Sequence, residues 1–216
     1  MKDCKYILFD LDGTLTDPEE GITKSVEKAL NYFGVFVESR KELLGFIGPP
    51  LVDSFMKYFS FSEEQALLAV EKYREYFSVK GLFENRKYEG VDELLEALKN
   101  KGKILILATS KPHIYAEKIM DHFDMSKYFH RIVGPELDGT LNHKHEVIEH
   151  IIKTEPIEDL SSAVMIGDRK MDIEGAHKNG IRAIGLTYSF GSREEHEKAG
   201  ADKIIDSIDE LYDILI

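Results

Sequence analysis

Four short apolar runs, separated by helical patterns, constrain the fold of this chain more than any other feature. The runs are nearly continuous in apolar residues and cover 5–10, 103–108, 162–167 and 182–187. Such runs are typical of strands that are buried on both faces, as in a parallel sheet. Helical patterns occupy the segments 91–100, 112–123, 144–153 and 170–180. This alternation, extended by weaker strand patterns at 131–134 and 202–206, predicts an α/β fold with a doubly wound, Rossmann-like parallel sheet.

The stretch from residue 17 to residue 84 interrupts this alternation, because it contains no convincing strand pattern. Apolar residues recur there at helical spacing, at Ile22, Val26, Ala29, Leu30 and Phe33. Ser62 and Gln65 form a capping-box pattern at the start of a further helix. We therefore expect a core domain of residues 1–16 and 85–216 and an inserted, all-helical cap domain of residues 17–84. Because the insert directly follows the first strand, it should stand over that strand's C-terminal end, where open α/β sheets bind ligands.

Composition and charge limit the classes of partner. The chain has 28 basic and 40 acidic residues, and its formal net charge of −12 opposes a broad surface for nucleic acid or an anionic membrane. The N-terminal segment carries charged residues on both sides of a short apolar run, so it resembles neither a signal peptide nor a membrane span. Cys4 is the single cysteine, which fits a reducing compartment. We expect a cytoplasmic protein, a monomer or a dimer, that acts on a small molecule.

Two aspartates lie where the first apolar run ends. Asp10 closes the run, Asp12 follows it, and Gly13 and Thr14 supply a turn. For such a pair alone, a turn or a helix cap explains the residues as well as a function does. Two carboxylates that are held close together repel each other, however, unless one is protonated or a cation lies between them.

Hydroxyl groups and a lysine follow at other element ends. Thr109 and Ser110 come directly after the second apolar run, and their hydroxyl groups could bind an oxyanion. Ser110 could instead cap the helix that begins near Pro112. Lys144 stands at the start of a helical pattern, where lysine is usually a solvated surface charge.

Two further aspartates follow the third apolar run. Asp168 leaves the run, and Asp172 comes four residues later, on the same side of the next helix. Because the C-terminal ends of parallel strands meet at one edge of a sheet, these carboxylates should converge with those of Asp10 and Asp12. Oxygen ligands of this kind suit Mg²⁺. The sequence therefore predicts a magnesium site, with hydroxyl groups and a lysine beside it.

These groups together resemble the motifs of the haloacid dehalogenase superfamily, in particular its phosphoglycolate-phosphatase-like branch with a helical cap. Asp10–Thr14 matches the motif DxDGT, and Gly167–Asp172 matches GDxxxD. Thr109 matches the Ser/Thr motif at a strand end, and Lys144 matches the lysine motif. The resemblance spans the whole chain. It departs from the family pattern at His145, where the family often has proline.

The resemblance implies a Mg²⁺-dependent phosphatase that acts on a small phosphorylated metabolite, such as phosphoglycolate or a nucleotide. Asp10 would attack phosphorus and carry an aspartyl phosphate, and Asp12 would protonate the leaving alcohol and then activate water. The implied metal ligands are Asp10, the backbone carbonyl of Asp12, Asp168 and, as a ligand or a supporting group, Asp172. The implied phosphate-binding residues are Thr109, Ser110 and Lys144.

Other activities on the same scaffold stay open, namely those of an inorganic pyrophosphatase and a sugar-phosphate mutase. The segment 46–51, FIGPPL, is similar to segments of both phosphoglycolate phosphatases and pyrophosphatases of this family, so it does not distinguish them. A receiver-like signalling module also gathers aspartates, a hydroxyl and a lysine at strand ends. Receivers place the phosphoacceptor on a later strand and lack a helical insert after the first, which favours the enzyme. Asp12 argues against the dehalogenases of the superfamily, which lack this second aspartate.

Overall fold

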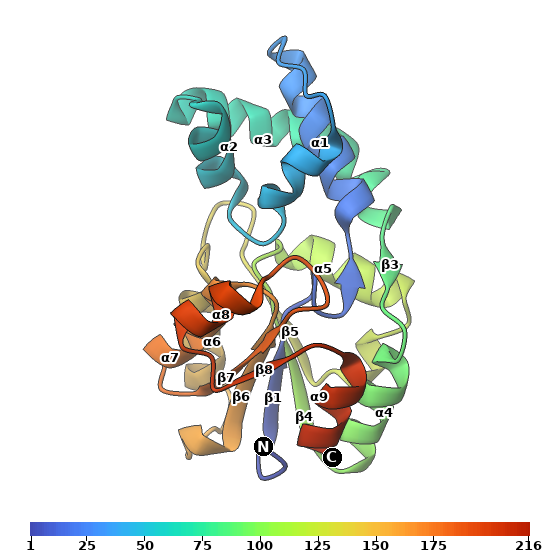
Figure 1. Ribbon diagram of the computed structural model, residues 1–216, viewed down its shortest axis with the longest axis vertical. Coiled ribbons are helices and arrows are strands. Elements are labelled where there is room, and N and C mark those ends of the chain that lie inside the picture. The colour runs from blue at the N-terminus through green and yellow to red at the C-terminus, as the bar shows by residue number, and fades with distance from the viewer. The chain divides into compact units, whose positions relative to one another are not determined.

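The chain divides into two compact units, as the computed structural model of residues 1–216 shows (Figure 1). One unit comprises Met1–Thr16 and Lys87–Ile216, and we call it the sheet unit. The other comprises Asp17–Arg86, and we call it the helical unit.

The sheet unit contains six parallel strands in the order β5-β4-β1-β6-β7-β8. The strands are β1 (Tyr6–Phe9), β4 (Ile104–Ala108), β5 (Arg131–Val133), β6 (Ala163–Gly167), β7 (Arg182–Leu186) and β8 (Lys203–Ile205). They include the two weaker strands expected from the sequence. The predicted doubly wound parallel sheet is therefore confirmed.

Strand register brings the polar segments together at one edge of this sheet. Phe9 pairs with Leu107 of β4 on one side and with Ile166 of β6 on the other. Asp10, which follows Phe9, therefore leaves the sheet beside the ends of both neighbouring strands. The order of the strands, with β1 in the centre, explains why segments that are more than 90 residues apart can share one site.

Helices cover both faces of the sheet. Successive side chains of a strand point to opposite faces, so the apolar strands present apolar side chains on both faces, and both need cover. Tyr6 and Leu8 belong to a buried cluster that includes Val147 and Ile148 of α6 (Lys144–Thr154) and Ile173 of α7 (Lys170–Lys178). Figure 1 shows α6 and α7 on one face and α4 (Val91–Asn100) and α9 (Ile208–Leu215) on the other. The remaining helical segments are α5 (His113–His122), α8 (Arg193–Ala199), η3 (Ser126–Tyr128) and η4 (Leu160–Ser162).

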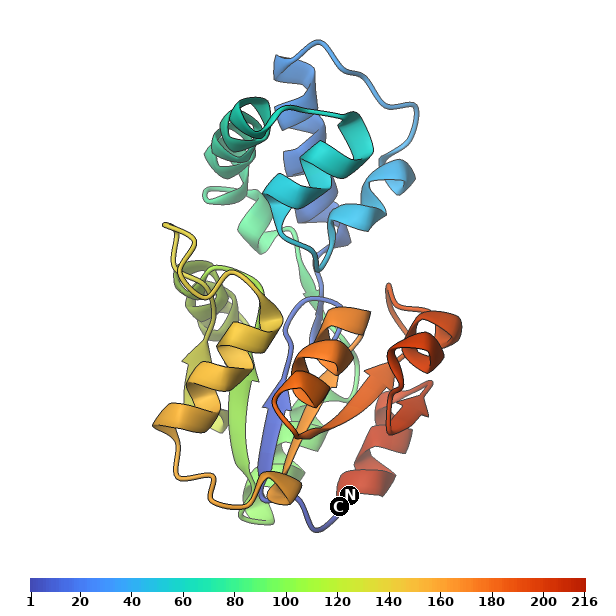
Figure 2. The same ribbon diagram turned by 90° about the vertical axis from the view of Figure 1, so that its left-hand side faces the viewer.

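The helical unit is built from α1 (Glu19–Tyr32), η1 (Arg40–Phe46), α2 (Leu51–Phe59), α3 (Glu63–Phe77) and η2 (Gly81–Phe83) (Figure 2). The expected capping box is present, since Ser62 N–H donates to Gln65 at 2.9 Å and Gln65 N–H donates to Ser62 at 3.2 Å. Phe46 and Phe55 are buried with their rings 4.9 Å apart, in the centre of an aromatic core. No helix of the chain is long and apolar enough to cross a bilayer.

Two short strands carry the chain between the units. β2 (Thr16–Asp17) and β3 (Arg86–Lys87) form a separate two-stranded sheet, and the Arg86 guanidinium lies 2.6 Å from the Asp17 carboxylate. The sequence did not predict these strands, because a segment of two residues has no periodicity to detect.

Candidate active site

Asp10 lies at the centre of the polar edge of the sheet. Its backbone N–H donates to the Ile166 carbonyl at 2.9 Å, which continues the pairing of β1 with β6 by one residue. Its carboxylate accepts a hydrogen bond from Leu11 N–H at 2.8 Å, and only 4% of the residue is exposed. The backbone therefore fixes the direction of this side chain before any ligand binds.

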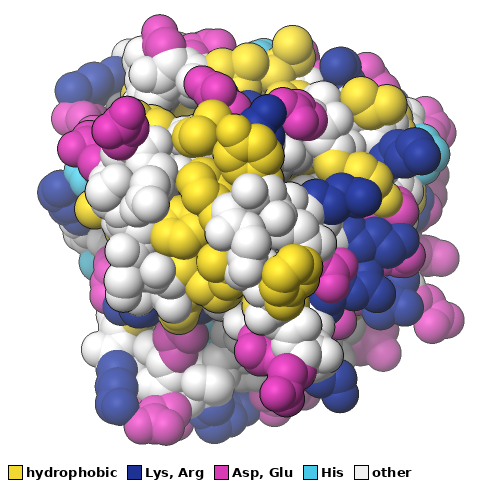
Figure 3. All heavy atoms as spheres, turned by 90° about the horizontal axis from the view of Figure 1, so that it is seen from above, with side chains coloured by type: hydrophobic (Ala, Val, Ile, Leu, Met, Phe, Trp, Pro, Cys, Tyr) yellow, Lys and Arg dark blue, Asp and Glu magenta, His cyan; other side chains and the backbone are white.

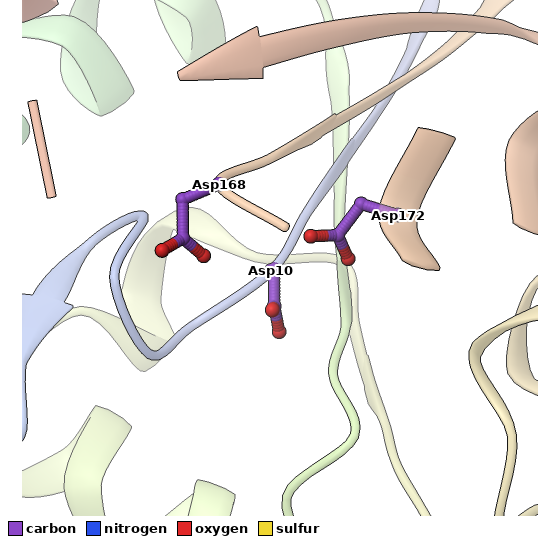
Figure 4. Close-up of side chains that lie close together, drawn as sticks. All are labelled: Asp10, Asp168 and Asp172. Atoms are coloured by element: carbon purple, nitrogen blue, oxygen red, sulfur yellow. The ribbon is translucent and has the colours of Figure 1, made fainter. Parts of the chain in front are cut away.

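Three carboxylates form a tight cluster around this point. Oxygen atoms of Asp10, Asp168 and Asp172 lie within 4.8 Å of one another, and all three residues are buried (Figure 4). Figure 4 shows Asp168 and Asp172 on either side of Asp10. Burial, followed by repulsion from Asp172 and Asp10, raises the pKa of Asp168 well above its ordinary value. The structure thus brings together three of the four aspartate side chains that the sequence singled out.

The cluster fits a divalent cation. Asp168 is fully buried, and its Oδ1 atom has no hydrogen-bond partner. A buried carboxylate oxygen without a partner is costly, and a hard cation such as Mg²⁺ would supply both a ligand bond and charge neutralisation. The donor set consists of carboxylate oxygens, which suits Mg²⁺ better than zinc.

Lys144 is not the solvated surface lysine that its position at a helix start favours. Its ammonium lies 3.0 Å from Asp10 and 2.9 Å from Asp172, and it donates to the Ala108 carbonyl at 2.7 Å. Burial lowers the pKa of Lys144, but the two carboxylates more than offset this effect and raise the pKa above its ordinary value. Lys144 is therefore a buried, charged cation beside the cluster.

Asp12 stands apart from the three clustered carboxylates and has a cation of its own. Its Oδ2 atom lies 2.8 Å from the ammonium of Lys111, and both side chains are almost fully buried. Burial raises the pKa of Asp12, although the charge of Lys111 opposes this shift. Asp10 and Asp12 are two residues apart and yet have different surroundings. Such a difference lets one site hold two carboxylates with different pKa values.

The hydroxyl residues at the end of β4 differ in exposure. Thr109 is buried, and its Oγ1 atom accepts a hydrogen bond from Lys111 N–H at 3.1 Å. Ser110 is half-buried. It does not cap the following helix, because α5 begins at His113 with Pro112 as its N-cap and has no side-chain cap.

Sequence reasoning missed one residue of this region and gave another a different part. It offers Lys111 only as an alternative to Lys144 for holding phosphate, whereas in the fold Lys111 pairs with Asp12. Ser189 follows β7 and lies 3.0 Å from the Asp168 carboxylate. It belongs to no motif, so nothing in the sequence marked it.

A scan against family models matches residues 7–186 to the haloacid dehalogenase-like hydrolases. A curated 5'-nucleotidase of Pseudomonas aeruginosa is 50% identical over 88% of this chain and 85% of its own length. The tyrosine-protein kinase PtkA of Mycobacterium tuberculosis is 32% identical over 98% of this chain and 72% of its own length. A phosphoglycolate phosphatase of Vibrio parahaemolyticus is 27% identical over 100% of this chain and 97% of its own length.

The solved structures agree with this relationship. The crystal structure of a predicted phosphatase from Clostridium acetobutylicum is 49% identical, covers 98% of both chains and superposes with a TM-score of 0.94. The similarity therefore extends over both units and is not restricted to the residues of the site.

Proposed function

This chain belongs to the haloacid dehalogenase-like hydrolase family and is a phosphatase, and we propose that it hydrolyses a small phosphate monoester through a phosphorylated Asp10, with Mg²⁺ as cofactor. The observation that carries the proposal is the buried cluster of Asp10, Asp168 and Asp172 with the Lys144 ammonium against it. This arrangement supports the proposal, because a nucleophile and metal ligands call for carboxylates and the binding of phosphate calls for a cation.

The clustered oxygens are the ligands that we propose for Mg²⁺. Asp10 and Asp168 would bind it through carboxylate oxygens and Asp12 through its backbone carbonyl, with Asp172 as a further ligand or a supporting group. The ion would neutralise charge on the phosphoryl oxygens, which is the main requirement of phosphoryl transfer.

Asp10 is the residue that we propose to attack phosphorus. A bond forms between its carboxylate oxygen and phosphorus while the bond from phosphorus to the ester oxygen breaks. Asp12 gives its proton to the departing alcohol. Water then attacks the phosphorus of the aspartyl phosphate, Asp12 takes a proton from this water, and inorganic phosphate leaves with Asp10 restored.

Lys144, Thr109 and Ser110 are the phosphate-binding residues of the proposal. Lys144 suits this role because its buried ammonium lies 3.0 Å from Asp10, where it would neutralise charge on a phosphoryl group that is transferred to Asp10. The hydroxyl groups at the end of β4 would add hydrogen bonds to the phosphoryl oxygens.

The proposed substrate is a nucleoside monophosphate, with phosphoglycolate as the second candidate. The relative that is 50% identical is named a 5'-nucleotidase, which supports a nucleoside monophosphate. The relative that is 27% identical is named a phosphoglycolate phosphatase, which supports phosphoglycolate. We also propose a cytoplasmic location, which the single free and buried Cys4 supports.

A panel of phosphate compounds tests the proposal. Nucleoside monophosphates, phosphoglycolate, a hexose phosphate, inorganic pyrophosphate and a phosphotyrosine peptide are each supplied with Mg²⁺, and released phosphate is measured. We expect release from a small monoester, none in excess chelator, and recovery when Mg²⁺ is restored. Preferred cleavage of pyrophosphate would replace the monoester proposal with the pyrophosphatase alternative. Full activity in excess chelator would contradict the metal requirement.

A further inference from the structure

The loop after β7 returns to the acidic cluster, and three consecutive residues of the loop contact Asp168 or the turn that follows Asp10. Tyr188 donates its hydroxyl hydrogen to the Thr14 carbonyl at 2.6 Å. The Ser189 hydroxyl is within hydrogen-bond distance of both the Gly13 carbonyl and Asp168 Oδ2, the latter at 3.0 Å. Phe190 N–H approaches the same Asp168 oxygen at 3.3 Å. We call residues 187–192 the clamp loop.

Asp168 is packed between the clamp loop and the turn that follows Asp10. Gly13 has φ of +77°, and a Cβ atom there would lie 2.2 Å from Asp168 Oδ2. A Cβ atom at Gly191 would lie 1.7 Å from the Asp168 backbone carbonyl oxygen. Only glycine fits at either position, because these distances are far below van der Waals contact. The two segments therefore hold Asp168 in one orientation.

The two oxygens of Asp168 have different surroundings. Oδ2 receives the contacts of the clamp loop, whereas Oδ1 is buried and has no hydrogen-bond partner. Figure 4 shows the carboxylate beside Asp10, on the side where the cluster forms. One oxygen is thus fixed by protein atoms, and the other is left for a ligand.

We propose that Ser189 is a positioning residue for the metal site: its hydroxyl fixes Oδ2 of Asp168 and ties it to the turn after Asp10, so that Oδ1 is presented to the divalent cation. This inference rests on the metal site of the proposed function. Ser189 does not touch the substrate or the cation. It acts through Asp168, in the way that hydrogen-bonded partners orient the ligands of other metal centres, where their loss costs about 10- to 100-fold in metal affinity.

Calorimetric titration of Mg²⁺ into the substrate-free protein tests the role of Ser189 directly. We expect Ser189→Ala and Ser189→Cys each to raise the Kd for Mg²⁺ about 10-fold, because neither side chain can replace the hydroxyl donor. The thiol is close in size to the hydroxyl group, so Ser189→Cys decides the question if Ser189→Ala does not fold. Saturating Mg²⁺ should restore kcat in both variants, with the substrate KM within about twofold of wild type.

Tyr188→Phe is the matched control, because it removes a hydrogen bond of the same loop but leaves both contacts to Asp168 in place. We expect it to lower Tm by about 2–4 °C, as a lost hydrogen bond does in a chain of this size, and to leave the Kd for Mg²⁺ unchanged.

The outcomes separate this inference from the proposed function. If wild type does not bind Mg²⁺, the metal site of the proposed function is wrong. If wild type binds Mg²⁺ and the Ser189 variants bind it equally well, the metal site stands and the role of Ser189 is wrong. If Tyr188→Phe weakens Mg²⁺ binding as much as the Ser189 variants do, general packing of the clamp loop explains the effect and the specific role of Ser189 is overturned.

Discussion

The two units of this chain differ in which polar groups they bury. The sheet unit buries six charged side chains at one edge of its sheet: Asp10, Asp12, Lys111, Lys144, Asp168 and Asp172. The buried polar residues of the helical unit are Thr23, Ser25 and Ser54, and each hydroxyl donates to a backbone carbonyl four residues earlier. Such hydroxyls are satisfied within the protein, whereas the sheet unit buries carboxylate oxygens that have no hydrogen-bond partner, among them Oδ1 of Asp12 and Oδ1 of Asp168.

The charged groups of the helical unit lie at its surface instead. Glu84, which pairs with Lys24, lines a pocket of about 460 Å³. The lining of this pocket is mainly charged and includes Arg40 and Lys41. Several large hydrophobic side chains of this unit are also exposed, among them Phe36 and Val79. Figure 3 shows hydrophobic side chains among charged ones on the face of the molecule seen from above. We therefore propose that the sheet unit carries out the reaction and that the helical unit selects the substrate.

The sharpest test of this division is Asp10→Asn. The amide has nearly the same size as the carboxylate but is a poor nucleophile, so we expect phosphate release to fall by at least about 10⁴-fold. The protein should remain folded, because the substitution also removes one of three mutually repelling carboxylates. Phosphate release and thermal unfolding measure the two effects. Activity within about tenfold of wild type would assign the nucleophile elsewhere.

Lys111→Met should have the next largest effect. Asp12 would keep its burial but lose the cation 2.8 Å away, and we expect kcat to fall about 100-fold because the proposed acid and base is misplaced. Leaving a buried charge without its partner should also cost about 3 kcal/mol in the free energy of unfolding, measured with urea. Lys118→Met, an exposed lysine on α5, is the control and should change either quantity little. Wild-type kcat in Lys111→Met would show that the ion pair does not position Asp12.

The double substitution Arg40→Ala with Lys41→Ala tests the helical unit. Phosphate esters are anions, so removing two cations from the charged pocket should change the ranking of substrates in kcat/KM by about tenfold. The kcat for the best substrate should change little, because the buried groups of the sheet unit remain. Lys57→Ala removes an exposed cation of the same unit that does not line the pocket. If Lys57→Ala changes the ranking of substrates as much, the proposal that the pocket selects substrates is wrong.

The smallest expected effect is the pH dependence of Mg²⁺ stabilisation. Burial raises the pKa of Asp168 well above its ordinary value and that of Asp172 to about 6. An acid with a raised pKa binds more protons in the folded state, so the metal-free protein loses stability as pH rises from about 4 through 6. Mg²⁺ should therefore raise Tm by about 4 °C or more at pH 8 and by about 1 °C or less at pH 5. An equal increase in Tm at pH 5 and pH 8 would show that the carboxylates are not protonated in the metal-free protein at pH 5.

Sequence patterns predict the sheet better than they predict the site. Buried strands such as β1 are visible because their apolar runs are continuous, and the ends of these runs reveal Asp10 and Asp168. The strands β2 and β3 escape prediction, since two residues carry no pattern. Which cation pairs with which carboxylate depends on strand order, so the contact of Lys111 with Asp12 appears only in the fold.

The residues that fix the orientation of Asp168 are the hardest to predict. Ser189 is 21 positions away from it and is brought near by the pairing of β6 with β7. The same serine in an exposed loop would look identical in sequence. Tertiary structure alone separates a positioning residue from an ordinary turn residue in this case.

The most direct test of the central claim is to trap the phosphorylated enzyme. Substrate with a labelled phosphoryl group is mixed with enzyme and Mg²⁺, quenched in acid within one turnover, and the tryptic peptide 6–24 is analysed. Borohydride reduction of an acyl phosphate converts the modified aspartate to homoserine and so identifies it. We predict homoserine at position 10, and none in Asp10→Asn. Rapid phosphate release without any label on this peptide would contradict the account.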